Sequence, residues 1–221
     1  MIDLSKVKKR TTADIAKRIV QDIPDGAHVN LGIGQPMTIS NYLPSDKEIL
    51  LHSENGLLGM GPLAKDHEID EELVNAGKQP VTMLPGASLC HHTDSFVMIR
   101  GGHIDICVLG AFQVSVKGDI ANWRTGDPKA IPAVGGAMDL ALGAKKLFVM
   151  MEHLTKSGES KLVLECTYPL TALAAVDCVY TDLATIAVTP EGLVALDWVD
   201  GLSFEELQSL SGVPMIQGSA Q

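Results

Sequence analysis

Short, strongly apolar runs recur along this chain, and glycine-rich segments follow several of them. The runs that predict buried strands are "AHVNLGIG" (27–34), "EILLHSE" (48–54), "PVTMLPG" (80–86), "HIDICVLGAFQV" (103–114), "KLFVMMEH" (146–153) and "CVYTDLATIAVTPEGLVALDWV" (178–199). Strands without a polar face need cover on both sides, and here they alternate with short helical segments. The sequence therefore predicts an α/β fold with an open, mostly parallel sheet and helices on both faces.

Helical segments are indicated by spacing and by end signals. A cap at Thr11 or Thr12 precedes apolar residues at helical spacing, namely Ile15, Ile19, Val20 and Ile23. Residues 68–76 are polar and helix-prone, and Gly77 is placed to end a helix there. Both segments are predicted to be helical.

A late helix is predicted by "SFEELQSL", which opens with a capping box formed by Ser203 and Glu206. The last apolar run is expected to hold two strands joined by a turn at Pro190-Glu191-Gly192. The chain has no internal repeat, low-complexity tract or evident linker, so a single domain over residues 1–221 is expected.

Charge and composition narrow the class of partner. The formal net charge is −10, from 17 basic and 27 acidic residues, which disfavours nucleic acid and anionic membranes as partners. The four cysteines show no C-x-x-C pairing and lie in or beside apolar runs, as core thiols of a reducing compartment do. No apolar run approaches the roughly 20 residues of a membrane span, and the N-terminal segment lacks a secretory signal. A cytoplasmic location is expected.

Three glycine-rich segments are predicted to be loops that follow strands: "GIGQP" (32–36), "ENGLLGMGP" (54–62) and "AVGGAMD" (133–139). In open α/β sheets, sites gather at the carboxyl ends of strands, and glycine lets a ligand approach the backbone there. The first loop lacks the third glycine of a dinucleotide fingerprint, because Met37 occupies that position. No phosphate-binding G-x-x-x-x-G-K-[ST] motif occurs. Nicotinamide and Walker-type nucleotide sites are therefore disfavoured.

The local sequence around Glu54 makes it the candidate catalytic residue. A carboxylate at a strand end is commonly an ordinary cap or turn residue, and that interpretation stays open. However, the preceding strand is apolar, and the following glycines leave room and free N–H groups. A carboxylate nucleophile needs proximity and a prepared site for the oxyanion it generates, which Gly135-Gly136 could provide. The spacing alone does not show that the two loops meet.

Histidines and serines give weaker signals. His91 and His92 are expected on a strand or turn that points them apart, and no third ligand at metal spacing accompanies them, so no metal site is expected. Glu152-His153 is either an acid–base pair or, as we favour, a polar anchor of the loop that follows. No G-x-S-x-G elbow occurs, which disfavours a serine hydrolase.

Longer motifs resemble a known family. The segments "SENGLLGMGP", "MIRGGHIDICVLGAFQVS", "GDIANW", "GGAMDL" and "ECTYPLT" together resemble the B (β) subunits of class I coenzyme A transferases of 3-oxo acids. The likeness runs from about residue 12 to the C-terminal helix. The segments "HHTDSF", "IPAVGGAMDL" and "HLTKSGESKLV" look most like the members of that family that act on 3-oxoadipate.

The resemblance implies roles for particular residues. Glu54, in the S-E-N-G motif, is implied to be the nucleophile, and the N–H of Gly136 one donor of the oxyanion hole. The other donor is implied to be a side-chain amide of an A (α) subunit. The residues implied to lie near coenzyme A and substrate are Gly32, Gly34, Asn55, Gly56 and Gly135.

The expected function is transfer of coenzyme A from succinyl-CoA to a 3-oxo acid, with 3-oxoadipate favoured, through a glutamyl-CoA thioester on Glu54. The resemblance also implies a CoA-transferase-like fold and an A2B2 assembly with an A subunit. No cofactor is expected, since the coenzyme A thioester is itself a substrate. The alternatives are transfer to acetoacetate or another short-chain acid, hydrolysis of a CoA ester with Glu54 as general base, and a non-catalytic metabolite-sensing domain.

Overall fold

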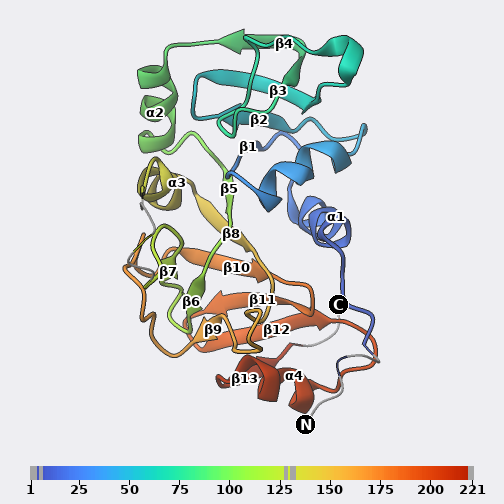
Figure 1. Cartoon of the computed structure of the whole chain (residues 1–221), viewed down its shortest axis with the longest axis vertical. Helices are drawn as coiled ribbons and strands as arrows, with labels where there is room; N and C mark the ends of the chain where they lie inside the picture. Colours follow the sequence, from blue (N-terminus) through green and yellow to red (C-terminus); the bar gives the residue numbers. More distant parts are fainter. Residues whose placement is uncertain (1–3, 5–6, 127–128, 130–132, 219–221) are drawn as a thin grey trace. The chain divides into compact units, whose positions relative to one another are not determined.

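A computed structural model of the chain describes residues 4, 7–126, 129 and 133–218 (Figure 1). These residues form two units, each with its own set of paired strands. The first unit comprises Ala16–Gly110 and Gly136–Leu147, and the second comprises the described parts of Met1–Ile15, Ala111–Gly135 and Phe148–Gln221. The prediction of a single domain over residues 1–221 stays a prediction. Of the motif "IPAVGGAMDL", Ile131 and Pro132 lie outside the described residues.

The first unit is built on five strands in the order β5-β1-β2-β3-β4. Their bounds are β1 His28–Leu31, β2 Leu50–Ser53, β3 Leu57–Leu63, β4 Val81–Leu89 and β5 Ile106–Leu109. At the centre, β1 pairs in parallel with both β2 and β5. The pairs β2–β3 and β3–β4 are antiparallel. Apolar, buried parallel strands therefore form the core of this unit, as the sequence predicts.

Helical segments accompany this sheet. They are α1 Thr12–Asp22, which enters the first unit at Ala16, η2 Gln35–Tyr42, η3 Asp66–Glu68, α2 His92–Arg100 and α3 Ala137–Gly143. Figure 1 shows α2 and α3 on one side of the strands and α1 on the other. The α/β fold with parallel strands and helices on both faces is confirmed. The predicted N-terminal helix is also confirmed, with Thr11 Oγ1 accepting a hydrogen bond from the N–H of Asp14 at 3.2 Å.

The second unit holds two groups of strands, in the orders β8-β10-β11-β12-β13 and β7-β6-β9, and β8 enters this unit at Phe148. Their bounds are β6 Gln113–Ser115, β7 Ile120–Ala121, β8 Lys146–Met150, β9 Leu162–Val163, β10 Val176–Tyr180, β11 Ala184–Thr189, β12 Gly192–Trp198 and β13 Met215–Gln217. The region expected to hold two strands thus holds three, β10, β11 and β12. The predicted late helix is α4 Phe204–Ser211, with Ser203 and Glu206 forming the expected capping box.

Two other expectations are wrong. Residues 69–76 form turns and an isolated bridge from Val74 to Pro80, and not a helix. Side chains there satisfy the backbone locally, since Asp70 accepts from the N–H of Glu72 at 2.9 Å. Strand β4 was expected to be buried, but it is the last strand of its unit and exposes Met83, Leu84 and Leu89. No helix among the described residues is both long enough and apolar enough to cross a membrane.

Candidate active site

Glu54 lies at the tip of a tight hairpin between β2 and β3. Ser53 pairs with Leu57, so the loop consists of Glu54, Asn55 and Gly56, and the N–H of Gly56 donates to the carbonyl oxygen of Ser53 at 3.0 Å. Gly56 has φ 108°, and a Cβ there would overlap the carbonyl oxygen of Cys90. Glycine at the last position of a three-residue hairpin loop tolerates both the positive φ and the close approach of that carbonyl. The S-E-N-G motif is therefore the sequence of the hairpin that presents the carboxylate.

The predicted glycine loop over residues 54–62 is wrong beyond Gly56. Residues from Leu57 onward form β3, and its glycines lie where neighbouring backbone comes close. A Cβ at Gly59 would lie 2.8 Å from the Cβ of Ala87 on β4. The register of β3 against β4 shifts on both sides of Met60. The glycines of this strand thus serve strand packing and are not a ligand loop.

The segment "VNAGKQ" (74–79) supports the hairpin from the other side. The side-chain amide of Asn55 donates to the carbonyl oxygen of Val74 at 2.8 Å, and the N–H of Ala76 donates to Oγ of Ser53 at 3.1 Å. Gly77, which was expected to end a helix, instead allows this segment to approach η2, since a Cβ there would lie 2.8 Å from the sulfur of Met37. The predicted site residue Asn55 therefore uses one side-chain donor to fix the loop.

The carboxylate of Glu54 lies directly against Gly136, at the N-terminal end of α3. A Cβ at Gly136 would overlap Oε2 of Glu54 and would lie 2.9 Å from Cζ of Phe96 on α2. The two glycine segments that the sequence left unconnected therefore meet in the first unit. Only glycine leaves room for both side chains at this point.

The electrostatic environment of Glu54 is unusual for a half-buried carboxylate. Its Oε2 is buried and has no hydrogen-bond partner among the described residues. Burial raises the pKa of Glu54 above its ordinary value, His92 lowers that pKa in part, and Asp139 raises it further. Arg100 holds Asp139 through Nε–Oδ1 and Nη2–Oδ2 contacts of 2.7 and 3.2 Å, which links α2 to α3. The result is one carboxylate oxygen whose lone pairs are not engaged by the described residues.

The other predicted site glycines differ in how the structure places them. Gly32 follows β1 and donates its N–H to the carbonyl oxygen of Val108 at 2.8 Å, and a Cβ there would lie 2.8 Å from Cδ2 of Leu109. Because β1 runs parallel to β2 with Asn30 opposite His52, Gly32 and the hairpin lie at the carboxyl ends of neighbouring strands. Gly34 (φ 97°) and Gly135 (φ 53°) both adopt backbone conformations that favour glycine.

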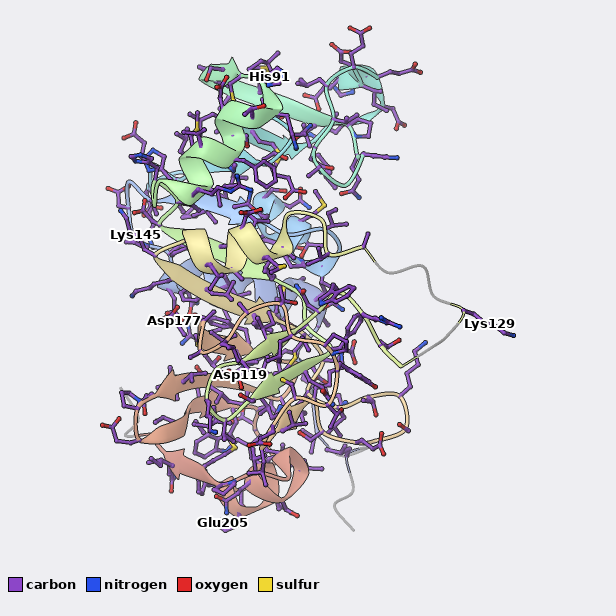
Figure 2. All side chains as sticks on the ribbon, turned by 90° about the vertical axis from the view of Figure 1, so that its left-hand side faces the viewer. His91, Asp119, Lys129, Lys145, Asp177 and Glu205 are labelled. Atoms are coloured by element: carbon purple, nitrogen blue, oxygen red, sulfur yellow. The ribbon has the colours of Figure 1, made fainter. Side chains whose placement is uncertain are left out.

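Helix α2 contributes site residues that the sequence did not reveal. His91 caps the N-terminus of this helix by accepting a hydrogen bond from the N–H of Thr93 at 3.2 Å (Figure 2), and His92 is the first residue of the helix. The prediction of a strand or turn is therefore wrong for His92. The rings of His92 and Phe96 are 4.9 Å apart. The available signal was the polar start "HHTD", which suits a helix N-terminus.

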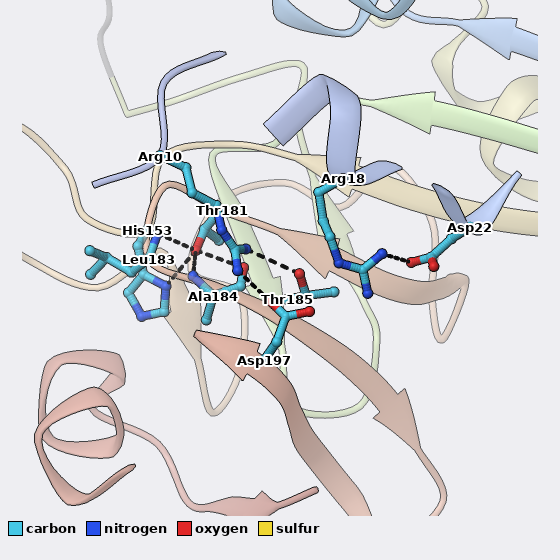
Figure 3. A network of polar contacts seen from close by, with 9 residues as sticks. All are labelled: Arg10, Arg18, Asp22, His153, Thr181, Leu183, Ala184, Thr185 and Asp197. Atoms are coloured by element: carbon cyan, nitrogen blue, oxygen red, sulfur yellow. Dashed lines mark hydrogen bonds and ion pairs between the residues drawn. The ribbon is translucent and has the colours of Figure 1, made fainter. Parts of the chain in front are cut away.

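The second unit contains the predicted polar anchor. His153 is fully buried, its Nδ1 lies 3.0 Å from Oγ1 of Thr181, and burial lowers its pKa to about 4. Figure 3 shows this contact beside Arg10, which bonds Thr185 at 3.1 Å and pairs with Asp197. The structural interpretation of His153 is confirmed. All four cysteines are free, and no group of three or more potential metal ligands occurs in the part of the chain that the structure describes.

Comparison with known proteins assigns the chain to an enzyme family. Residues 12–199 match the family model described as coenzyme A transferase. The chain belongs to the coenzyme A transferase family, and its enzymatic class is the transfer of coenzyme A.

Individual relatives agree with this assignment. The chain is 62% identical over 210 residues to the B subunit of the 3-oxoadipate CoA-transferase of Pseudomonas putida, covering 95% of this chain and 98% of the relative. It is 44% identical over 199 residues to the B subunit of a probable succinyl-CoA:3-ketoacid coenzyme A transferase of Bacillus subtilis, covering 90% and 92%. Among solved structures, an acyl-CoA transferase from Escherichia coli O157:H7 in a thioester complex with CoA has a similar fold, with TM-score 0.72 and 17% identity, covering 98% of this chain and 43% of that one.

Proposed function

We propose that this chain is the B subunit of an enzyme that moves coenzyme A from succinyl-CoA to a 3-oxo acid, with 3-oxoadipate as the acceptor. The support for this acceptor is the higher identity to the relative named for 3-oxoadipate, 62% against 44% for the relative named for a 3-ketoacid. Both alignments cover most of this chain, 95% in the first and 90% in the second.

The first half-reaction begins at Glu54. Its carboxylate attacks the thioester carbon of succinyl-CoA, the C–S bond breaks, and an acyl–glutamyl anhydride and the CoA thiolate result. The thiolate then attacks the glutamyl carbonyl carbon of the anhydride. Succinate leaves with one oxygen that came from Glu54, and the enzyme holds a glutamyl-CoA thioester.

The second half-reaction reverses these steps with the acceptor. The carboxylate of the 3-oxo acid attacks the glutamyl thioester, which releases the CoA thiolate and forms an anhydride between the acceptor and Glu54. The thiolate then attacks the carbon of this anhydride that came from the acceptor's carboxylate. The 3-oxoacyl-CoA leaves, and Glu54 is a carboxylate again with one oxygen from the acceptor. No atom is oxidised or reduced and no water is consumed, so we propose that the reaction needs no metal or redox cofactor.

The observation that carries this proposal is the unpartnered, buried Oε2 of Glu54 against Gly136, among the described residues. A carboxylate oxygen held by donors would be a poorer nucleophile, because its lone pairs would be engaged. Burial also keeps water from the anhydride, which would otherwise be hydrolysed. The N–H of Gly136 is proposed as one donor to the oxyanion that forms beside it.

A partner is part of the proposal. The relatives are named as B subunits, so we propose an A subunit that closes the site, supplies the second oxyanion donor and forms an A2B2 assembly. The residues proposed to line the coenzyme A and substrate site are Gly32, Gly34, Asn55, Gly56 and Gly135. With a net charge of −10, the partners are not expected to include nucleic acid or a membrane surface, and the proposed location is cytoplasmic.

The test is to trap the covalent intermediate. The chain, co-purified with its A subunit, is mixed with succinyl-CoA alone, and intact mass is measured before and after borohydride, which reduces a thioester to an alcohol. A coenzyme A adduct that maps to Glu54 is expected, together with free succinate. Comparing turnover of 3-oxoadipate with that of acetoacetate then tests the acceptor.

A matched control distinguishes a site carboxylate from a surface one. Glu54→Ala is expected to form no adduct, whereas Glu71→Gln, which changes an exposed carboxylate of the same unit, should behave as the unsubstituted chain does. Steady release of free coenzyme A without an adduct would favour a hydrolase instead. Neither adduct nor release with the A subunit present would refute catalysis by this chain.

A further inference from the structure

A chain of buried hydrogen bonds crosses the first unit and ends at the residue before the candidate nucleophile. Nδ2 of Asn30 lies 3.0 Å from Nδ1 of His52, and Nε2 of His52 lies 2.8 Å from Oγ of Ser95. Oγ of Ser95 lies 3.3 Å from the carbonyl oxygen of Ser53. At the other end, the thiol of Cys107 donates to Oδ1 of Asn30 at 3.8 Å. None of these residues is more than 4% exposed.

Only one direction of donation satisfies every group in this chain. An amide nitrogen donates and cannot accept, so Nδ1 of His52 accepts from Asn30. A neutral imidazole then carries its proton on Nε2 and donates it to Ser95 Oγ, which leaves the hydroxyl proton for the Ser53 carbonyl. Burial lowers the pKa of His52 from 6.5 to about 4, so the ring is neutral at neutral pH. The network is therefore fully satisfied and has a single orientation.

The carbonyl on which the network ends is the one that closes the Glu54 turn. The N–H of Gly56 donates to Ser53 O at 3.0 Å, and Ser95 supplies the second donor. Ser95 belongs to α2, the helix that also places Phe96 beside Gly136. The hydroxyl thus joins the start of the hairpin loop to the helix that lines the site.

We propose that Asn30, His52 and Ser95 are positioning residues that fix this turn so that the Glu54 carboxylate stays in place as the thioester approaches. Because all three are buried, they act through the backbone and not on the substrate. A shift of about 1 Å in a reacting group can cost about 100-fold in rate. The proposal rests on the proposed function, since it assigns these residues to the chemistry of Glu54.

The second unit offers a matched control for the purely structural value of such a bond. Ser211 is also fully buried, its Oγ lies 2.9 Å from Nε2 of His153, and it donates to the carbonyl oxygen of Leu207 at 2.8 Å. Ser211→Ala therefore removes the same kind of serine–histidine bond as Ser95→Ala does, away from the hairpin in sequence and in a different unit.

The experiment measures the rate of glutamyl-CoA formation in single turnover, with succinyl-CoA and the complex of both subunits. Ser95→Ala is expected to slow adduct formation by at least about 10-fold while the KM for succinyl-CoA changes by less than about 3-fold. Ser211→Ala should leave both values near those of the unsubstituted chain, even where thermal stability falls by the same amount. Ser95→Cys, which keeps a weaker donor of similar size, should give an intermediate rate and serves if Ser95→Ala does not fold.

Substitution of His52 provides an independent readout. His52→Gln keeps an N–H that can reach Ser95, so it should retain more activity than His52→Leu, which has no donor. Equal rates for these two variants, or a Ser95→Ala rate no lower than that of Ser211→Ala, would overturn the inference alone. Absence of any adduct on the unsubstituted chain would overturn the proposed function, and this inference with it.

Discussion

Adding one methyl group at Gly136 is expected to abolish most of the catalytic rate while the chain still folds. The backbone there, at φ −81° and ψ 1°, is open to alanine, so the substitution introduces no conformational strain. The new Cβ would overlap Oε2 of Glu54 and lie 2.9 Å from Cζ of Phe96. Both obstacles are side-chain ends, and the carboxylate is the one that can turn away.

The magnitudes separate the two effects. Restoring ordinary contact requires the carboxylate oxygen to move by roughly 1 Å, a displacement that can cost about 100-fold in rate, or about 2.7 kcal/mol of transition-state stabilisation. Overpacking of a buried site costs about 1–3 kcal/mol, and replacing glycine by alanine returns about 0.4–1 kcal/mol through the unfolded chain. The expected net loss of stability therefore lies between about 0 and 2.6 kcal/mol, which is a fall in Tm of no more than about 10 °C for a chain of this size.

The assay is the single-turnover rate of glutamyl-CoA formation by Gly136→Ala, with Tm measured on the same sample. Gly126→Ala is the control, because a Cβ there meets no described atom within 4 Å and the residue has no positive φ. A Gly136→Ala enzyme that forms the adduct at the control's rate would show that Glu54 does not need the space beside Gly136, and the reasoning about the site would be wrong.

Other consequences concern stability and pH. Burial lowers the pKa of His52 and His153 from 6.5 to about 4, so the unfolded chain takes up protons at a higher pH than the folded chain does. The free energy of unfolding, measured in urea titrations, should therefore fall between pH 6.5 and pH 4 by up to about 3 kcal/mol per histidine. A pH-independent midpoint would contradict this. Burial raises the pKa of Glu54 above 4.5, so the ionised form of Glu54 destabilises the folded chain. The inactive variant Glu54→Gln lacks this charge, so its Tm minus that of the unsubstituted chain should increase as the pH rises from 4.5 to neutral. Gly56→Ala, with φ 108° and a Cβ overlapping the carbonyl of Cys90, should cost more than about 2 kcal/mol, whereas Gly26→Ala has open space and should cost less.

Strongly patterned elements were predictable from the sequence. The strands at 28–31, 50–53 and 106–109 are short apolar runs with glycine or turn signals at their ends, and the helices α1 and α4 carry side-chain caps at their starts. In these places local propensity and tertiary burial agree, so the pattern is sufficient.

Elsewhere the sequence pattern was misleading, because of tertiary contacts in one segment and local side-chain hydrogen bonds in another. Gly59 and Gly61 suggested a loop, yet both lie in β3, where Ala87 and Thr82 of β4 come too close for a Cβ. A helix was expected over residues 68–76, but Asn75 Oδ1 accepts from the N–H groups of Gly77 and Gln79 and forms a turn instead.

The candidate site was predictable only in part. Glu54 stood out because a lone carboxylate followed an apolar strand, and the family resemblance pointed to Gly136. Their contact, and the approach of Phe96 and His92 from α2, depend on how distant segments pack. The unpartnered Oε2 and the network behind the hairpin, both within the described residues, likewise arise from tertiary structure, which no local pattern reports.

Oxygen tracing tests the central claim, that Glu54 carries the coenzyme A covalently, most directly. The complex of both subunits turns over succinyl-CoA with a 3-oxo acid whose carboxylate is labelled with ¹⁸O, and the released succinate is analysed by mass spectrometry. Passage through the glutamyl anhydride predicts that the label moves from the acceptor to Glu54 and, in the next turnover, to succinate. The same turnover is then run in H₂¹⁸O with unlabelled acceptor. Succinate that acquires no label from the labelled acceptor, but is labelled by the water, would contradict the account.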